Sequence, residues 1–166
     1  MPSPRRNFNL SDPSERRQAD ERPGKFHVVR GGRGKRPRGA RRRGRVLIVE
    51  DNGDSRELYA LYFDLVGYDA LTAADGYAGV EVAMRRMPDV IVMDLAMPGM
   101  SGVEAIRRLK TDARTRKIPI ILLTGYHARA IEEGALEAGA KAFLTKPCLP
   151  EDLEAQVRRV MERRRK

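Results

Sequence analysis

The sequence predicts an α/β fold, a doubly wound five-stranded parallel sheet over residues 45–166. Short apolar runs recur along this part of the chain, and each is followed by apolar residues at helical spacing. The run at residues 90–93 consists of four consecutive apolar residues, which is typical of a strand buried on both faces of a sheet. Strict alternation of such strands with helices indicates parallel strands joined by helical crossovers.

The first 44 residues differ in composition and are predicted to form a disordered basic extension rich in Arg, Gly and Pro. Residues 1–45 contain 15 of the 33 Lys and Arg but only 4 of the 23 Asp and Glu, so they account for the net charge of +10. Branched aliphatic residues are scarce there, so the segment cannot bury enough apolar surface to offset the entropy lost on ordering.

Two runs in this extension, Arg30–Gly34 and Arg41–Arg43, are of a kind that binds phosphate backbones in a salt-dependent way. One interpretation is a nucleic-acid or anionic-surface arm, with the folded domain as its regulator. We favour a solvated extension without a role, or upstream sequence translated from a misplaced start. A salt-dependent gel shift of the full-length protein against a chain starting at Arg45 discriminates between these interpretations.

Cysteine content and hydropathy indicate the cellular compartment in which the protein resides. The single cysteine, Cys148, excludes an internal disulfide and suits a reducing environment. No apolar run reaches the roughly 18 residues of a membrane span, and the N-terminus lacks the apolar stretch of a signal peptide. We therefore expect a cytoplasmic protein with no membrane partner.

The first two strand and helix pairs follow from apolar periodicity. Val46–Val49 is the first predicted strand, and Asp54 with Glu57 is expected to cap the helix after it, which Gly67 closes. The inward face of this helix is predicted to hold Leu58, Leu61, Tyr62 and Leu65. A strand at about residues 68–73 leads to a second helix, which Pro88 ends and whose inward face is predicted to hold Val80, Ala83, Met84 and Met87.

The third strand ends at Asp94, and a Met-Pro-Gly turn follows it. Ser101 and Glu104 form a capping box for the third helix, whose apolar positions are Val103, Ile106 and Leu109. A fourth strand over Ile118–Thr124 precedes an Ala- and Gly-rich helix at about residues 128–138, with Ile131, Ala135 and Ala138 inward.

The last strand, Ala142–Thr145, leads to a helix at about residues 150–164. This helix is predicted to bury Leu153, Val157, Val160 and Met161. Among doubly wound arrangements we predict the flavodoxin-like (βα)5 fold, with strand order 2-1-3-4-5.

Polar side chains end several strands at one edge of this sheet, because the carboxyl ends of parallel strands share an edge. They are Glu50, Asp51, Asp94, Thr124 and Lys146. Three carboxylates in one pocket repel one another unless a cation joins them, and a single lysine is a weak counter-charge. Mg²⁺ suits a site with a few carboxylates and open water positions, and Mn²⁺ is a second candidate.

The same groups suit phosphoryl transfer, which needs charge neutralisation beside an aligned nucleophile. Taken singly, each has an ordinary structural explanation: Asp94 as a turn former, Thr124 as a β-branched strand residue and Lys146 as a solvated charge. Their assembly at one edge favours the chemical interpretation.

With these motifs in place, residues 45–164 resemble the receiver domain of two-component response regulators. The matching motifs are the acidic pair Glu50-Asp51, Asp94 before the Met-Pro-Gly loop, Thr124, and Lys146-Pro147. The resemblance implies a phosphoprotein that carries an aspartyl phosphate, and a cis peptide bond between Lys146 and Pro147.

The resemblance also implies a role for each residue. Asp94 would accept the phosphoryl group, and Thr124 and Lys146 would engage its oxygens. Phe143 has the position of a switch aromatic that turns inward when Thr124 moves, so the signal would emerge on the fourth helix, fifth strand and fifth helix. The Mg²⁺ ligands would be Asp51, Asp94 and the backbone carbonyl of Ala96, with Glu50 acting through water.

A sensor histidine kinase or a histidine phosphotransfer protein would, by the same resemblance, donate the phosphoryl group. The protein would signal by docking to an unidentified partner or by relaying phosphate. It would be no enzyme toward other substrates, catalysing only its own Mg²⁺-dependent phosphorylation and dephosphorylation. Because only about two residues follow the last helix, the chain resembles stand-alone members; whether it forms a dimer stays open.

Overall fold

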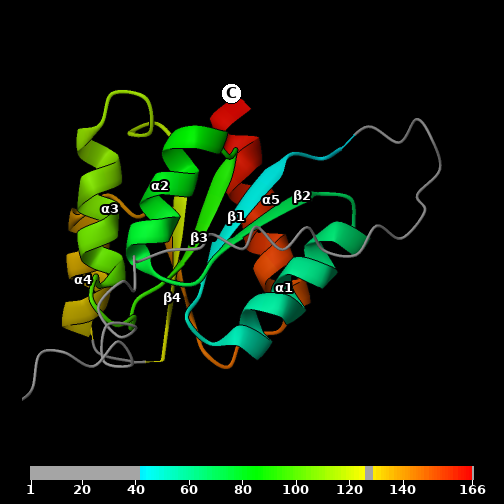
Figure 1. The fold of residues 1–166 in the computed structure, drawn as a ribbon, viewed down its shortest axis with the longest axis horizontal. Helices are drawn as coiled ribbons and strands as arrows, with labels where there is room; N and C mark the ends of the chain where they lie inside the picture. The colour runs from blue at the N-terminus through cyan, green and yellow to red at the C-terminus, as the bar shows by residue number, and fades with distance from the viewer. Residues whose placement is uncertain (1–41, 126–128, 166) are drawn as a thin grey trace, which may run out of the picture.

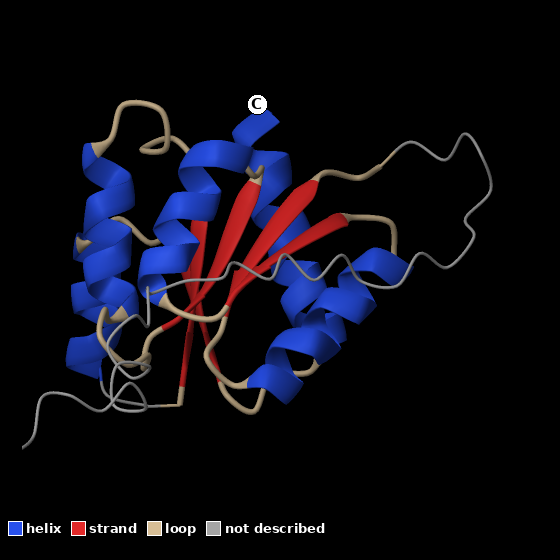
Figure 2. Cartoon of the chain, in the orientation of Figure 1, coloured by secondary structure: helices blue, strands red, loops and turns tan. Residues whose placement is uncertain are grey.

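The computed structural model describes residues 42–125 and 129–165. They form one parallel sheet in the order β2-β1-β3-β4-β5, with a helix after each strand (Figures 1 and 2). The strands are β1 (Arg45–Val49), β2 (Asp69–Ala73), β3 (Val90–Asp94), β4 (Ile120–Thr124) and β5 (Ala142–Thr145). The helices are α1 (Gly53–Leu65), α2 (Gly76–Arg86), α3 (Gly102–Thr111), α4 (Arg129–Glu137) and α5 (Pro150–Arg165). The predicted fold class and strand order are confirmed.

The sheet separates two hydrophobic clusters, because successive side chains of a strand point to opposite faces. In β1, Leu47 and Val49 belong to the cluster under α2, α3 and α4, whereas Val46 and Ile48 belong to the cluster under α1 and α5. Figure 1 shows these two helical layers on either side of the sheet. Because both faces are covered, every residue of β3 and β4 is buried, which explains their unbroken apolar runs.

The predicted inward face of α1 is wrong. Leu58, Leu61 and Leu65 are 55%, 51% and 79% exposed, whereas the buried residues of the helix are Tyr59, Ala60 and Phe63. Phe63 is fully buried, and its ring packs edge-on against Tyr68 at 5.3 Å between centroids. Aromatic rings bury more surface than leucines, and the helix therefore rotates its aromatic stripe toward the sheet. The leucines remain as an exposed apolar stripe.

The start of α1 also differs from the prediction. Its N-cap is Asn52, whose side chain accepts a hydrogen bond of 2.9 Å from the backbone N–H of Ser55. Asp54 lies inside the first turn, where its negative charge is favourable near the helix N-terminus. At α3, by contrast, the predicted Ser101 cap is present, since its Oγ accepts from the N–H of Glu104 at 3.2 Å.

The inward face of α2 is shorter than predicted. Ala83 is fully buried, but Met87 is 45% exposed, because the helix ends at Arg86 and Met87 has a left-handed conformation with φ of 46°. Gly79 brings α2 close to the sheet, and a Cβ there would lie 2.8 Å from the Val49 side chain. Of the predicted inward residues of α4, Ala135 is buried and Ala138 packs against the core, while the side chain of Ile131 lies outside the described part.

Contacts of the domain begin a few residues before the predicted boundary at residue 45. The N–H of Arg43 donates to the carbonyl of Gly67, and the Arg43 guanidinium bonds to Glu154 of α5 at 3.1 Å. The hydroxyl of Tyr68 donates to the same carboxylate oxygen at 3.0 Å. Glu154 is thus satisfied although it is only 9% exposed. The remainder of the predicted extension, residues 1–41, lies outside the described residues.

None of the helices in the described residues combines the length and apolar composition needed to cross a bilayer.

Candidate functional site

Backbone hydrogen bonds at the carboxyl edge of the sheet bring the predicted site residues together. The N–H of Leu95 donates to the carbonyl of Leu123, and the N–H of Lys146 donates to the carbonyl of Thr124 at 2.7 Å. These bonds extend the pairing of β3, β4 and β5 by one residue each, so the residues that follow the strands stay in register. Asp94, Thr124 and Lys146 therefore lie at neighbouring strand ends.

Three carboxylates form an acidic cluster at this edge. Glu50, Asp51 and Asp94 each offer an oxygen, and these oxygens lie within 4.8 Å of one another. Glu50 and Asp94 are only 1% and 4% exposed, whereas Asp51 is exposed. The cluster predicted from the strand ends is thus present, with two of its members in the interior and one at the surface.

Lys146 joins the two buried carboxylates. Its Nζ lies 2.7 Å from Oε2 of Glu50 and 2.8 Å from Oδ2 of Asp94. Burial raises the pKa of Glu50, and the nearby charge of Asp94 adds to this, against the hydrogen bond from Lys146. Burial alone would lower the pKa of Lys146, but its hydrogen bonds with the two carboxylates outweigh burial and raise the pKa. The ammonium group therefore stays charged at neutral pH.

The acidic cluster fits a hard divalent cation. Three ionised carboxylates and one ammonium leave two negative charges uncompensated, and all of the offered side-chain ligands are oxygen atoms. Oxygen ligands with one exposed, water-accessible carboxylate suit Mg²⁺. The Ala96 carbonyl, the predicted backbone ligand, belongs to the loop just after Asp94, where the N–H of Ala96 donates to Oδ1 of Asp94 at 3.2 Å.

The loop that follows Asp94 folds back tightly on that residue. The N–H of Gly102 donates to the carbonyl of Leu95 at 2.9 Å, and a Cβ on Gly102 would lie 2.2 Å from the backbone oxygen of Asp94. Only glycine fits at such a distance. The first residue of α3 is thus a glycine because the helix starts against the backbone of the predicted phosphoacceptor.

The remaining predicted site residues lie around the cluster. Thr124 is the last residue of β4 and is only 1% exposed. Phe143 lies in β5 opposite Leu122, partly buried against the core cluster of the α2, α3 and α4 side. The peptide bond between Lys146 and Pro147 is cis, as the resemblance implies.

One residue of the site, Arg56, was not predicted from the sequence. Its Nη1 donates to the backbone carbonyl of Glu50 at 2.7 Å and to that of Asp51 at 3.2 Å. The guanidinium therefore holds the loop that carries two of the three carboxylates. Its spacing from Glu50 is a weak signal, because an arginine in the first turns of a helix is ordinarily a solvated charge.

We expect Arg56→Gln to weaken Mg²⁺ binding by about tenfold, since hydrogen bonds from a charged donor contribute about 1.5–3 kcal/mol. Calorimetric titration with MgCl₂ measures this. Arg164→Gln is the matched control, because Arg164 also donates to a backbone carbonyl, that of Asp89, away from the cluster. Tighter Mg²⁺ binding in Arg56→Gln would contradict the positioning role and show that removing the positive charge dominates.

Comparison with known proteins agrees with this geometry. Residues 46–158 match the family described as the response regulator receiver domain, and the match covers more than half of the chain. The chain belongs to the response regulator receiver family. The resemblance stated from the sequence motifs is confirmed, and with it the general function, since receiver domains of two-component systems are phosphorylation-dependent switches.

Curated relatives of this receiver include transcription factors and larger regulators. The phosphate regulon transcriptional regulatory protein PhoB of Pseudomonas aeruginosa is 39% identical over 118 residues, which is 71% of this chain and 52% of PhoB. Response regulator PleD of Caulobacter vibrioides is 40% identical over 114 residues, 69% of this chain and 25% of PleD. The chain thus spans about half the length of PhoB and a quarter of PleD.

Solved structures of receivers share this fold. Chemotaxis protein CheY4 of Vibrio cholerae has a TM-score of 0.67 and 31% identity, covering 70% of this chain and 97% of its own. The receiver domain of the sensor histidine kinase PA1611 of Pseudomonas aeruginosa has a TM-score of 0.67 and 30% identity, covering 72% of this chain and 98% of its own. That structure contains a magnesium ion coordinated in its active site cleft.

Proposed function

We propose that this receiver accepts a phosphoryl group on Asp94 from a phosphohistidine of a sensor histidine kinase or a histidine phosphotransfer protein. The observation that supports it is the pairing of the buried Asp94 carboxylate with Lys146 inside an acidic cluster that fits Mg²⁺. The protein then passes the signal by docking to a partner or by relaying phosphate. It has no other substrate, and catalyses only its own phosphorylation and dephosphorylation.

The transfer step is a displacement at phosphorus. A carboxylate oxygen of Asp94 attacks the phosphorus of the phosphohistidine, the P–O bond forms, and the P–N bond breaks with its electron pair going to the imidazole nitrogen, which takes a proton from water. The Lys146 ammonium, already 2.8 Å from Asp94, is placed to bind an oxygen of the incoming phosphoryl group. The hydroxyl of Thr124 is the second donor that we propose for these oxygens.

Mg²⁺ bound by Asp51, Asp94 and the Ala96 carbonyl, with Glu50 acting through water, would neutralise charge on the transferred group. Mn²⁺ offers the same ligand preferences and is the proposed substitute. A cytoplasmic location agrees with the half-buried free thiol of Cys148, which suits a reducing compartment.

The direct test is labelling with a small phosphodonor. Full-length protein incubated with acetyl phosphate and Mg²⁺ should gain one phosphoryl group in intact-protein mass spectrometry, and EDTA should prevent it. Transfer from a panel of purified, autophosphorylated histidine kinases would then identify the donor. Labelling that proceeds equally in EDTA would contradict the proposed chemistry.

The exposed leucine stripe of α1 supports a mode of docking in which a helical phosphodonor covers this stripe beside the acidic cluster. The helix starts two residues after Asp51, and Leu58 and Leu61 are more than half exposed. An apolar stripe next to a reactive carboxylate is a surface that a partner can cover while it delivers its phosphoryl group. Such a partner would bring its phosphohistidine to the acidic edge.

We expect the double variant Leu58→Asp, Leu61→Asp to lose about tenfold or more in the rate of phosphotransfer from a cognate kinase, because two carboxylates would be desolvated on docking. Labelling by acetyl phosphate should be unchanged, since the cluster is intact. Leu136→Asp, at a leucine of α4 that is 49% exposed, is the matched control. Equal rates of phosphotransfer from the kinase to the wild type, the double variant and Leu136→Asp would show that α1 is not part of the docking surface.

The proposed output is a change in the face formed by α4, β5 and α5. Phe143 is the residue of β5 that we propose to turn inward when Thr124 moves toward the phosphoryl group, as the family resemblance implies. Phe143 is only partly buried against the core, so an inward turn would bury more of its ring.

A further inference from the structure

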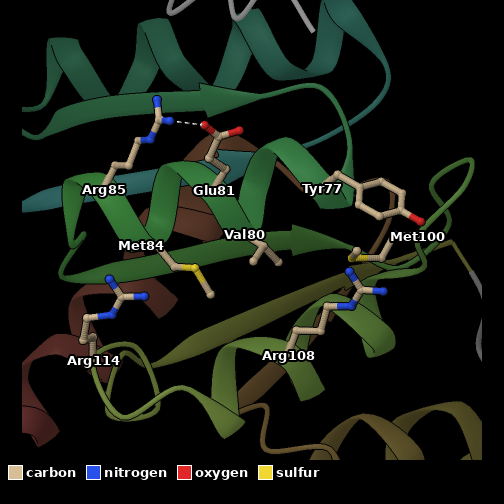
Figure 3. A pocket seen from close by; sticks show the side chains of 8 residues that line it. All are labelled: Tyr77, Val80, Glu81, Met84, Arg85, Met100, Arg108 and Arg114. Carbon is tan, nitrogen blue, oxygen red and sulfur yellow. Dashed lines mark ion pairs between the residues drawn. The ribbon is translucent and has the colours of Figure 1, made fainter. Parts of the chain in front are cut away.

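A groove between α2 and α3 lies outside the acidic cluster and has no part in the proposed chemistry. Its volume is about 400 Å³, and Figure 3 shows the side chains that line it. Val80 and Met84 project from α2 toward α3, and Tyr77 lies at one end of the same row. Arg108 of α3 and Arg114 of the segment after it lie on the opposite side. Glu81 and Arg85 of α2 also line the groove and form an ion pair of 2.8 Å with each other. The groove thus has a largely apolar wall on α2, where this pair neutralises itself, and a basic wall on the α3 side.

The apolar wall is continuous along α2. Tyr77, Val80 and Met84 are spaced i, i+3 and i+7, so they share one face over about two turns, or roughly 10 Å. Tyr77 is 56% exposed. Its end of the groove is closed by Met100, against whose backbone the start of α2 packs so tightly that a Cβ on Gly76 would lie 2.9 Å from the Met100 oxygen. Met100 is itself fully buried and forms the floor at this end of the groove.

The basic wall has hydrogen-bond donors left for a ligand. Arg108 pairs with Glu104 and Arg114 pairs with Asp112, but neither acid lines the groove. A guanidinium carries five N–H donors in a planar fork, so each arginine can bind a second carboxylate. The guanidinium carbon of Arg108 also lies 5.4 Å from the centroid of the Tyr77 ring, which holds it over the mouth of the groove.

The two segments that form the groove are the basic part of the folded domain. Residues 76–88 and 102–117, which include α2 and α3, contain eight Lys and Arg and three Asp and Glu. The rest of residues 46–166 contains ten Lys and Arg and sixteen Asp and Glu. These segments are therefore net positive on a domain whose remaining residues are net negative, and the lining itself has three arginines against one glutamate, which favours an acidic partner.

We propose that the groove between α2 and α3 binds an acidic amphipathic segment of a partner protein. The segment inserts apolar side chains along Tyr77, Val80 and Met84, and its carboxylates bind Arg108 and Arg114. A nucleic-acid strand would satisfy the arginines but would leave the Val80 and Met84 wall against a hydrated backbone, so the apolar wall favours a peptide. This inference does not depend on phosphorylation and is tested on the unphosphorylated protein.

The test is a titration of full-length, ¹⁵N-labelled protein with a synthetic alanine-based helical peptide that has two leucines spaced four residues apart and two glutamates beside them, because adjacent glutamates at every position would repel one another and unfold the helix. Amide shifts are expected along α2 and α3. The double variant Arg108→Glu, Arg114→Glu should lose about tenfold or more in affinity, which is about 1.4 kcal/mol, and should gain binding to the same peptide with lysines in place of glutamates. Met84→Asp should also weaken the glutamate peptide.

Arg158→Glu is the matched control, because Arg158 lies on α5 in a separate hollow beside Arg43. It should leave the affinity unchanged. Shifts confined to residues 1–41, or equal affinities in the wild type and the double arginine variant, would overturn the proposal by placing the peptide elsewhere. Tighter binding of a single-stranded RNA oligonucleotide than of the peptide at the same residues would overturn it in favour of a nucleic-acid site.

Discussion

Asp94→Asn is expected to abolish phosphorylation of the full-length protein by acetyl phosphate and Mg²⁺. The amide has nearly the shape of the carboxylate but lacks the negative oxygen that attacks phosphorus. The variant should remain folded, because removing one negative charge from a cluster of three carboxylates relieves repulsion. Intact-protein mass spectrometry should show the phosphoryl adduct in the wild type and only background in the variant.

Asp54→Asn is the matched control for this experiment. Asp54 is an exposed acid in the first turn of α1, three residues after Asp51 and outside the acidic cluster. It should be labelled as the wild type is. Full labelling of Asp94→Asn, with an adduct located on another acid, would show that the cluster surrounds a different nucleophile and would refute the assignment.

Lys146→Met is expected to lower the free energy of unfolding by about 2–3 kcal/mol in EDTA at neutral pH. The change leaves Glu50 and Asp94 close together without their shared ammonium group, and losing one partner of a fully buried pair costs about 3–5 kcal/mol. The smaller value reflects the 27% exposure of the Lys146 side chain, which lets water screen the remaining charges. Urea unfolding measures the difference.

The stability of Lys146→Met should depend on pH in a defined direction. Burial already raises the pKa of Glu50 above its ordinary value, and removing the ammonium raises it further. The folded state then binds a proton more readily than the unfolded chain does, so stability is lost as pH rises through the raised pKa and returns as pH falls toward the ordinary value. The defect should therefore be smaller near pH 5 than near pH 7.5.

Mg²⁺ should restore much of the stability of Lys146→Met, because a divalent ion supplies the missing positive charge and binds only the folded cluster. Lys141→Met, at an exposed lysine before β5, is the control and should change stability little. Lys146→Met could instead be as stable as the wild type in EDTA, at every pH and with or without Mg²⁺. That result would show that the ammonium group does not stabilise the pair of buried carboxylates.

The sequence alone was sufficient for the fold class and the residues of the acidic edge, whereas the strand order was one choice among doubly wound arrangements, which the structure confirmed. Apolar runs of four or five residues separated by helical patterns leave few arrangements other than a parallel sheet. Once the strands are parallel, Glu50, Asp94 and Lys146 share one edge, because each lies at the carboxyl end of its strand; the order β1-β3-β4-β5 then brings them into contact. These conclusions rest on connectivity and periodicity, which are local properties of the chain.

The face of α1 could not be found in the same way. Two apolar stripes compete on this helix. One consists of the leucines Leu58, Leu61 and Leu65, and the other contains the aromatic residues Tyr59 and Phe63. Which stripe is buried depends on the partners across the interface, here Tyr68 beside Phe63 and the Cys148 carbonyl that accepts a hydrogen bond from Tyr59 at 2.9 Å. Periodicity ranks the stripes by hydropathy, whereas packing ranks them by shape and satisfied polar groups.

What the sequence by itself determined was therefore the parallel α/β fold class and the chemical groups of the acidic edge, because both follow from residue order along parallel strands. Only the tertiary structure decided how those groups are held and what surrounds them. Arg56 donates to the carbonyls of Glu50 and Asp51, and Arg108 and Arg114 form the basic wall of the groove. Both features depend on long side chains that could equally lie in solvent. Their direction is set by neighbours from other elements, and no local pattern in the chain encodes it.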